Sequence, residues 1–279
     1  MRNTDGDSVF SDAMSQVYER HLVPLVFEPY AAALAECLAS TPACRVLEIA
    51  AGTGVLTRAL ASRLPTSTSI TATDLNQTML DQAAVRGTSR PVSWRQADAL
   101  RLPFDAGAFD AVVCQFGVMF FPDKPRAFAE ARRVLKRGGV FLFSVWDRIE
   151  ENEFADAVTA ALASVFAHDP PRFLSRTPHG YFGRPMIERD LSHGGFTTTA
   201  RFETVAARSR ADSPVTPAIA YCQGTPLRNE IEARDPSGLT EATNVAAETI
   251  RQRFGGGAVD GGIQAHIVTV SASPRGRRA

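Results

Sequence analysis

Residues 46–57 join an apolar, strand-like pattern to an acidic, glycine-rich turn in the sequence VLEIAAGTGVLT. Gly52 and Gly54 carry no Cβ, so the backbone of this turn can pass close to a small ligand at the carboxyl end of a strand. Glu48 stands within the strand, four residues before Gly52. Its carboxylate suits a cationic amine and repels a pyrophosphate. The segment therefore favours a nucleoside that carries an amino acid over a dinucleotide.

Two further carboxylates stand at the ends of the next two apolar segments. Asp74 closes the segment TATD, twenty residues beyond Gly54, and Asp98 follows a third segment in the sequence QADAL. The carboxyl ends of parallel strands line one crevice, so we expect the three carboxylates in one cleft. There Asp74 can accept hydrogen bonds from both hydroxyls of a ribose. Asp98 can accept one from an adenine amine, while the N–H of Ala99 serves a ring nitrogen.

Some of these residues also have simpler interpretations. Asp74 can form a turn or cap the helix that follows, and Asp98 can start a turn. Met79 and Phe116 are suited to lie on either side of a purine, but core packing explains such apolar residues equally well. Glu48 is harder to explain without a ligand, because a charged side chain within an apolar strand is rarely buried without a partner.

The elements that must position these residues alternate along the chain. Apolar segments bounded by turn residues predict strands, and helical spacing predicts the segments between them. The strands are expected at 45–49, 69–74, 92–97, 109–115 and 140–145, and the helices at 56–64, 77–85 and 124–137, the last ending at Gly138 and Gly139. With two later strands, this order predicts an α/β fold: a Rossmann-like, doubly wound, seven-stranded mixed sheet, mostly parallel, with helical lid insertions.

The remaining segments are expected to surround this core. The spacing of 11–39 predicts two or three helical pieces, broken at Pro24 and Pro29. After Trp146 we expect helices at 152–167, 186–193, 217–222 and 239–254, a loop at 170–185, strands at 196–206 and 264–272, and a glycine-rich linker at 255–262. The domain prediction is one domain, 1–279, with an N-terminal helical cap at 1–40, a cofactor-binding core at 41–148, lid or substrate segments at 149–190 and 207–262, and a last strand at 263–273.

Bulk properties disfavour several classes of partner. Thirty Lys and Arg balance thirty Asp and Glu, so no global field gathers nucleic acid or an anionic membrane. The four cysteines form no CxxC pair, which argues against a zinc site or a disulfide framework and favours a reducing cytoplasm. The N-terminus is polar and acidic, and we expect no apolar run of the length needed to span a bilayer. We expect a cytoplasmic monomer or homodimer without metal, nucleic-acid or membrane partners.

The ordered motifs resemble the core of the class I S-adenosylmethionine-dependent methyltransferases, in the group called methyltransferase type 11 or 25. The matching strings lie within 46–145 and are EIAAGTG from Glu48, DLNQTML from Asp74, DALRLPF from Asp98, FD at Phe109, QFG from Gln115 and RVLKRGG from Arg133. The resemblance implies S-adenosylmethionine as cofactor, with its methionine portion at Glu48 and 50–54. The cofactor-binding set that we expect is Tyr18, Glu48, Ala50, Gly52, Gly54, Thr57, Asp74, Leu75, Met79, Asp98, Ala99, Gln115 and Phe116.

The resemblance also implies methyl transfer, here to an oxygen or nitrogen of a small-molecule acceptor. The fourth strand ends in CQFG, without the proline turn that marks amide or adenine-amine acceptors in related enzymes. Alignment of the reactants is the main task of such a site, so a dedicated base is optional; His179, in TPHGYFG, is the first candidate. An apolar wall for the acceptor is expected from Phe173, Tyr181, Phe182, Met186 and Tyr221.

Two other functions fit parts of the sequence. An NAD(P)-dependent oxidoreductase could use a related sheet, but its fingerprint requires a third glycine near Thr57 and does not accommodate Glu48. A non-catalytic protein could keep the same fold and pocket for ligand binding or regulation. Turnover of labelled cofactor separates this last alternative from an enzyme.

Overall fold

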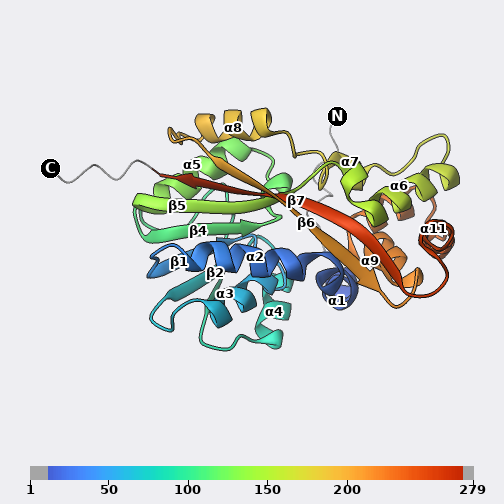
Figure 1. Cartoon of the computed structure of the whole chain (residues 1–279), viewed down its shortest axis with the longest axis horizontal. Helices are drawn as coiled ribbons and strands as arrows, with labels where there is room; N and C mark the ends of the chain where they lie inside the picture. Colours follow the sequence, from blue (N-terminus) through green and yellow to red (C-terminus); the bar gives the residue numbers. More distant parts are fainter. Residues whose placement is uncertain (1–11, 273–279) are drawn as a thin grey trace. The chain divides into compact units, whose positions relative to one another are not determined.

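A computed structural model describes residues 12–272 of the chain, and its elements form two compact units (Figure 1). Unit 2 comprises 30–145, 181–204 and the chain from His266 onward, and unit 1 comprises the chain up to Pro29, 146–180 and 205–265. One seven-stranded sheet has the order β3-β2-β1-β4-β5-β7-β6. This confirms the predicted α/β class.

The first strands of the sheet are parallel and belong to unit 2. They are β1 (Arg45–Ile49), β2 (Ser69–Asp74), β3 (Ser93–Gln96) and β4 (Phe109–Gln115), linked by helices that include α3 (Val55–Arg63) and α4 (Gln77–Arg86). β1 lies between β2 and β4. Because β1 and β4 are covered on both faces, most of their residues are buried and apolar. The order brings the turns after β1, β2 and β4 to one edge of the sheet.

The later strands differ from their predicted bounds. Helix α5 (Lys124–Val134) ends before the glycines, and β5 runs from Leu135 to Trp146. The register of β5 on β4 shifts near Phe109, so Gly138, at φ 77°, lies in an irregularity within the strand rather than at a helix end. Strand β6 (Arg201–Ala211) starts five residues later than predicted, and β7 (Val259–Ser271) takes up part of the expected linker.

Strand β7 runs antiparallel to β5. Ala272 N bonds to Gly139 O, and Asp147 N bonds to Gln264 O, so residue numbers rise along β5 while they fall along β7. These pairings make the sheet mixed, as predicted. Of the predicted last strand, residue 273 lies outside the described residues.

The N-terminal stretch is one continuous run of helix rather than separate pieces. α1 (Asp12–Val17) passes into a π-helix, η1 (Tyr18–Phe27), and then into α2 (Glu28–Ala39). Pro24 lies within the π-helical turns, and Pro29 is the second residue of α2, so neither proline interrupts the helical run.

This helical run also corrects the expectation about membrane-spanning length. By length and composition alone, Ala13–Ala39 could cross a bilayer. The two prolines, which predict breaks from the sequence, do not interrupt the helix. More than half of its most apolar window, 56%, is buried inside the protein, as in a core helix.

Unit 1 is largely helical. Its helices after η1 are η3 (Ile149–Glu151), α6 (Glu153–Val165), α7 (Phe173–Arg176), α9 (Val215–Gly224), α10 (Leu227–Arg234) and α11 (Leu239–Phe254). α11 packs against both α6 and α9, and Figure 1 shows these helices together. α10 was not predicted, and neither was α7, which lies in the segment expected to be a loop.

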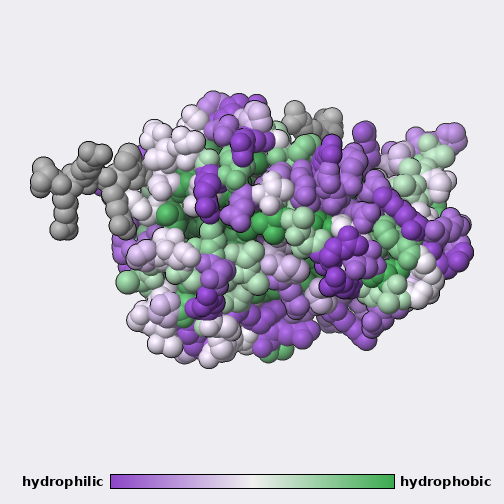
Figure 2. All heavy atoms as spheres, viewed as in Figure 1, coloured by the Kyte–Doolittle hydropathy of each residue, from purple (hydrophilic) through white to green (hydrophobic). Residues whose placement is uncertain are grey.

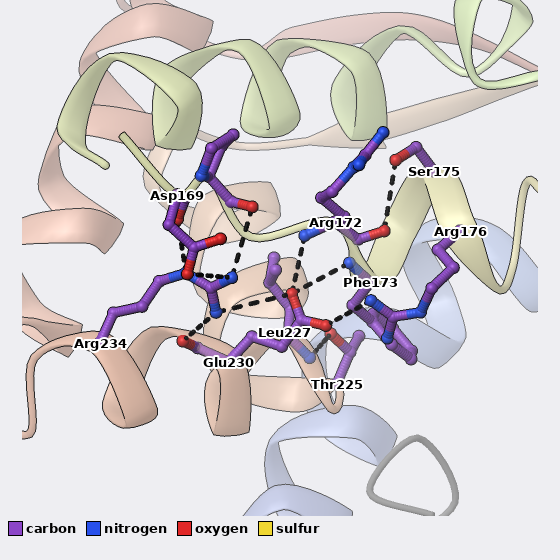
Figure 3. A network of polar contacts seen from close by, with 10 residues as sticks. Asp169, Arg172, Phe173, Ser175, Arg176, Thr225, Leu227, Glu230 and Arg234 are labelled. Carbon is purple, nitrogen blue, oxygen red and sulfur yellow. Dashed lines mark hydrogen bonds and ion pairs between the residues drawn. The ribbon is translucent and has the colours of Figure 1, made fainter. Parts of the chain in front are cut away.

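A polar network joins α7 to α10 within unit 1 (Figure 3). The carboxylate of Glu230 accepts hydrogen bonds from the backbone N of Arg172, at 2.7 Å, and of Phe173, at 3.2 Å. Nη1 of Arg176 lies 2.7 Å from the other oxygen of Glu230. The carboxylate thus holds the amino end of α7. A helix this short is not stable through its own helix propensity and depends on such tertiary contacts.

Two helical elements of unit 2 follow the loops beyond β4. η2 (Val118–Phe120) precedes α5, and α8 (Arg184–His193) lies beside α5 (Figure 1). Gly194 permits this packing, because a Cβ there would meet the Cβ of Phe128 at 2.6 Å. The predicted helix 186–193 is therefore confirmed, with two more residues at its start.

The surface mixes hydrophilic residues with patches of hydrophobic ones on the face drawn in Figure 2. Among the described residues, the large hydrophobic side chains that are exposed are Leu75, Val85, Phe182 and Val215. Two of them, Leu75 and Phe182, were predicted from the sequence to contact ligands.

Candidate functional site

The turn after β1 has an unusual backbone. Ala50, Gly52 and Gly54 all have positive φ, at 53°, 56° and 81°. Gly adopts this region readily, but Ala50 is strained there, as residues at ligand sites often are. The N–H of Gly52 donates to Oδ2 of Asp74 at 2.8 Å, which ties the turn to the end of β2.

Asp74 organises two turns at once. Its Oδ1 accepts from the N–H of Asn76 at 2.8 Å, and Asn76 in turn caps α4 by accepting from the N–H of Thr78. Burial raises the pKa of Asp74, and the backbone hydrogen bonds oppose that rise. The turn-forming interpretation of Asp74 is therefore observed. Its contact with a ribose stays a prediction.

Glu48 is buried in the middle of β1, with 1% of its surface exposed. Oγ1 of Thr57, also buried, donates to Oε2 of Glu48 at 2.6 Å. Burial raises the pKa of Glu48 to about 8, against the lowering effect of the Thr57 hydrogen bond. This rise favours the neutral carboxyl group, and the pairing of Glu48 with an ammonium group stays a prediction.

The end of β4 approaches the turn after β1. A Cβ on Gly117 would lie 2.5 Å from the Cβ of Ala50 and 2.7 Å from Sγ of Cys114. Phe116, the residue before it, has φ 51°, and its N–H points to Ser144. Ala50 and Phe116 are the two non-glycine residues with positive φ that the described chain contains. Both occur where a ligand is expected.

Phe116 and Met79 are buried, at 5% and 4% exposure. The ring of Phe116 packs edge-on against Tyr30, 5.3 Å between centroids. Core packing accounts for both side chains, and their contact with a purine stays a prediction. Gln115, just before Phe116, is buried as well.

The turns after β2 and β3 present more open surface. Leu75, next to Asp74, is 57% exposed, so core packing does not explain it. Asp98 is exposed and accepts from the N–H of Leu100 at 2.8 Å, which confirms that it starts a turn. An exposed leucine near carboxylates offers an apolar face and polar acceptors, the combination that a nucleoside requires.

Thr53 lies in the turn after β1 and was not predicted to be a site residue. Its Oγ1 is buried, and it has no hydrogen-bond partner among residues 12–272. Gly54, in contrast, has a packing role: a Cβ there would meet Trp94 at 3.0 Å and Ala83 at 3.1 Å. The orphaned hydroxyl, the carboxylates and the exposed Leu75 together fit a polar nucleoside with an amino-acid arm.

The predicted residues divide between the two units. Unit 2 holds Glu48, Ala50, Gly52, Gly54, Thr57, Asp74, Leu75, Met79, Asp98, Ala99, Gln115, Phe116, Tyr181, Phe182 and Met186. Unit 1 holds Tyr18, Phe173, His179 and Tyr221. The roles of these four toward a cofactor or an acceptor stay predictions.

Aromatic rings of unit 1 form a series that ends at His179. Tyr18 lies 5.2 Å from Phe27, Phe27 lies 6.0 Å from Trp146, and Trp146 lies 6.0 Å from His179. Phe173 and Tyr221 are buried in the same unit.

His179 is buried, at 5% exposure, and its ring orientation is fixed. Nδ1 lies 2.8 Å from the carbonyl oxygen of Asp147. A carbonyl only accepts, so Nδ1 carries the proton and Nε2 keeps its lone pair. Burial lowers the pKa of His179 to about 4, which makes it a weak proton acceptor.

Comparisons with known proteins agree with this geometry. The family model of a methyltransferase domain matches 47–143. A malonyl-[acyl-carrier protein] O-methyltransferase of Geobacter sulfurreducens is 32% identical over 76% of this chain and 77% of its own. A ubiquinone/menaquinone biosynthesis C-methyltransferase of Cupriavidus necator is 33% identical, over 59% and 72%.

A solved structure shows the same fold. Phosphoethanolamine N-methyltransferase 2 of Haemonchus contortus, in complex with S-adenosylhomocysteine, has a TM-score of 0.59 at 17% identity. The similarity covers 98% of this chain and 60% of that one.

Proposed function

Because the chain belongs to the S-adenosylmethionine-dependent methyltransferases, we propose that it transfers the methyl group to an oxygen or nitrogen of a small-molecule acceptor. The observation that supports the cofactor's place best is the 2.8 Å hydrogen bond between Gly52 N and Asp74 Oδ2. It joins the glycine turn of β1 to the acidic end of β2, where nucleosides bind in open sheets of this kind.

We assign roles in the cofactor site by the chemistry of each side chain. Asp74 accepts from the ribose, and Asp98 with the N–H of Ala99 serves the adenine. Glu48, together with the turn 50–54, faces the methionine portion. Leu75, already exposed, covers one face of the purine. These side chains bind and orient the cofactor, and none of them takes part in bond making.

The cofactor supplies a methyl group on a positive sulfur. In the transfer a lone pair of the acceptor oxygen or nitrogen forms the new bond to carbon while the carbon–sulfur bond breaks. The sulfur keeps that electron pair and becomes neutral. The acceptor gives up a proton or its negative charge. The protein contributes mainly alignment and exclusion of water, which can supply roughly 7–11 kcal/mol.

The segments 149–190 and 207–262 are the proposed determinants of the acceptor. The relatives named above include an O- and a C-methyltransferase. An assay should therefore also test carbon as the atom that accepts the methyl group. The enzyme is proposed to work in the cytoplasm, on a small molecule and without nucleic acid.

Two measurements test this proposal. Calorimetry with S-adenosylhomocysteine is expected to show one site per chain, and NADH is expected not to bind. Incubation with methyl-labelled S-adenosylmethionine and a panel of carboxylic acids, phenols and amines is expected to yield a labelled product. Mass spectrometry of that product then locates the methyl group. Tight cofactor binding without turnover of any acceptor would favour a ligand-binding role instead.

A further inference from the structure

Lys124 opens α5, on the segment that leaves the carboxyl end of β4. It stands nine residues after Gln115, the last residue of β4, and therefore beyond the same sheet edge as the turns after β1 and β2. The side chain is only partly exposed. It was not among the residues predicted from the sequence, because nothing near it in the chain marks a ligand site.

The ammonium group of Lys124 is held within unit 2 by a carbonyl oxygen and an aromatic ring. Nζ donates to the carbonyl oxygen of Phe121 at 2.9 Å and lies 4.8 Å from the centre of the Tyr181 ring. Among the described residues it forms no ion pair within 4.0 Å. Burial lowers the pKa of Lys124, and the charge of Asp190 opposes this effect. A cation that has lost part of its hydration is stabilised by an anionic partner.

Asp190, the carboxylate whose charge acts on Lys124, already has other partners. The hydroxyl of Tyr181 donates to Oδ2 of Asp190 at 3.0 Å, and Arg189 contacts Oδ1 at 3.1 Å. Arg189 therefore offsets the charge of Asp190, and the cluster of Lys124, Tyr181, Arg189 and Asp190 retains one positive charge. Nζ uses one of its three protons on Phe121, so the others remain for an incoming anion.

We propose that Lys124, over the ring of Tyr181, binds a carboxylate of the methyl acceptor, so that the substrate is an acidic small molecule. The inference rests on the proposed function and narrows its acceptor class. The carboxylate either anchors the acceptor or is itself the oxygen nucleophile. Phe182, which is 38% exposed next to Tyr181, supplies apolar surface for the acceptor's body.

Binding in the presence of S-adenosylhomocysteine tests the subsite without relying on turnover. The probes are matched pairs: 4-hydroxybenzoate with 4-hydroxybenzamide, and the malonyl half-thioester of N-acetylcysteamine with its amide. We expect at least one acid to bind about tenfold or more tightly than its amide, the effect of one charged hydrogen bond. Equal affinity within both pairs would overturn the proposal.

Variants then assign the preference to Lys124. Lys124→Met is expected to abolish the difference between acid and amide, and Lys124→Arg to restore part of it. Asp190→Asn removes a nearby negative charge and is expected to strengthen acid binding, which a merely structural role would not do. Arg132→Met, a matched loss of positive charge from an exposed position of α5, should leave the preference intact.

The outcomes separate the subsite from the reaction. An acid preference that Lys124→Met removes supports the subsite even when no probe is methylated. Methylation of neutral acceptors alone, with no acid preference, retains the proposed function and rejects the subsite.

Discussion

Oγ1 of Thr57 donates a hydrogen bond of 2.6 Å to Oε2 of Glu48, and both side chains are buried. The bond links β1 to the first turn of α3 across the glycine turn. Burial raises the pKa of Glu48 to about 8, which favours the neutral carboxyl group when no cation lies beside it. A cation that arrives beside this group stabilises its charged form and lowers its pKa.

Cofactor binding is therefore expected to release a proton from Glu48. If the ammonium of the ligand lies beside Glu48, about one proton per site leaves near pH 7, and affinity rises between pH 6 and 8 before levelling off. Calorimetry of S-adenosylhomocysteine in phosphate and in Tris measures the proton, because the two buffers differ in ionisation enthalpy. Glu48→Gln should abolish the buffer dependence. If the binding enthalpy of the wild-type protein is equal in both buffers, the ammonium group of the ligand does not lie beside Glu48.

Loss of the Asp74 carboxylate is expected to weaken cofactor binding. Asp74→Ala removes the acceptor for Gly52 N and the proposed partner of the ribose, so affinity should fall by roughly 1.5–3 kcal/mol, the range for a charged hydrogen-bond partner. The control is Asp81→Ala, which removes an exposed carboxylate from the neighbouring helix α4 and should change affinity little. Equal affinities of the two variants would refute the role of Asp74.

A methyl group at Gly117 is expected to separate the two turns that meet there. Gly117→Ala places a Cβ 2.5 Å from that of Ala50, and such overpacking costs about 1–3 kcal/mol of unfolding free energy. Cofactor affinity should fall too, because the turn after β1 must move. Gly183→Ala is the matched control, since its Cβ has nothing within 4 Å. Urea unfolding and calorimetry measure both effects.

Much of the sheet was predictable, because local pattern and tertiary burial agree there. β1, β2, β4 and α11 have the predicted bounds. α10 was missed because it follows Pro226 and buries only Leu227 and Ile231, too few residues for a helical stripe. The bounds of β6 were wrong because most of its side chains are at least partly exposed, so its sequence lacks the alternation that marks a half-buried strand.

The sequence predicts which residues lie at the candidate site better than it predicts the contacts they make. Spacing predicts that Glu48 and Asp74 reach one sheet edge, but not that Thr57 and Gly52 are their hydrogen-bond donors. Lys124 could not be found, because its partner Tyr181 is distant in sequence and only the packing of α8 on α5 brings their segments together. Contacts of this kind depend on tertiary structure rather than on motif spacing.

His179 is expected to give the protein a pH-dependent stability. Its pKa is about 4 in the folded protein and about 6.5 when unfolded, so its stabilising effect is complete above pH 6.5 and is lost as pH falls through 4. The slope approaches about 1.4 kcal/mol per pH unit between these values. His179→Asn can keep the donor to Asp147 but does not titrate, so the slope should flatten.

Fluorescence of Trp146, whose ring lies 6.0 Å from that of His179, reports this unfolding in a Trp94→Phe background. Urea titrations from pH 4.5 to 7 give the slope for each variant. His193→Asn, the same substitution at an exposed histidine, is the control for the exchange of side chains. An unchanged slope in His179→Asn would show that another group titrates.

Glu230 is expected to decide whether α7 forms. Its carboxylate serves the backbone of Arg172 and Phe173 and the guanidinium of Arg176, and only 19% of the side chain is exposed. Glu230→Gln removes the charge from these bonds and should lower the local opening free energy of 172–177 by about 1–3 kcal/mol. Hydrogen exchange measures this opening.

The matched control for Glu230 is Glu232→Gln on the same helix. Glu232 pairs with Arg228 and is 36% exposed on its side chain, so its loss should cost at most about 1 kcal/mol. If both variants speed exchange in 172–177 equally, the effect comes from a general loosening of α10. If only Glu230→Gln does so, the carboxylate itself holds the amino end of α7, as the 2.7 Å hydrogen bond from Arg172 N indicates; Figure 3 draws this bond as a dashed line.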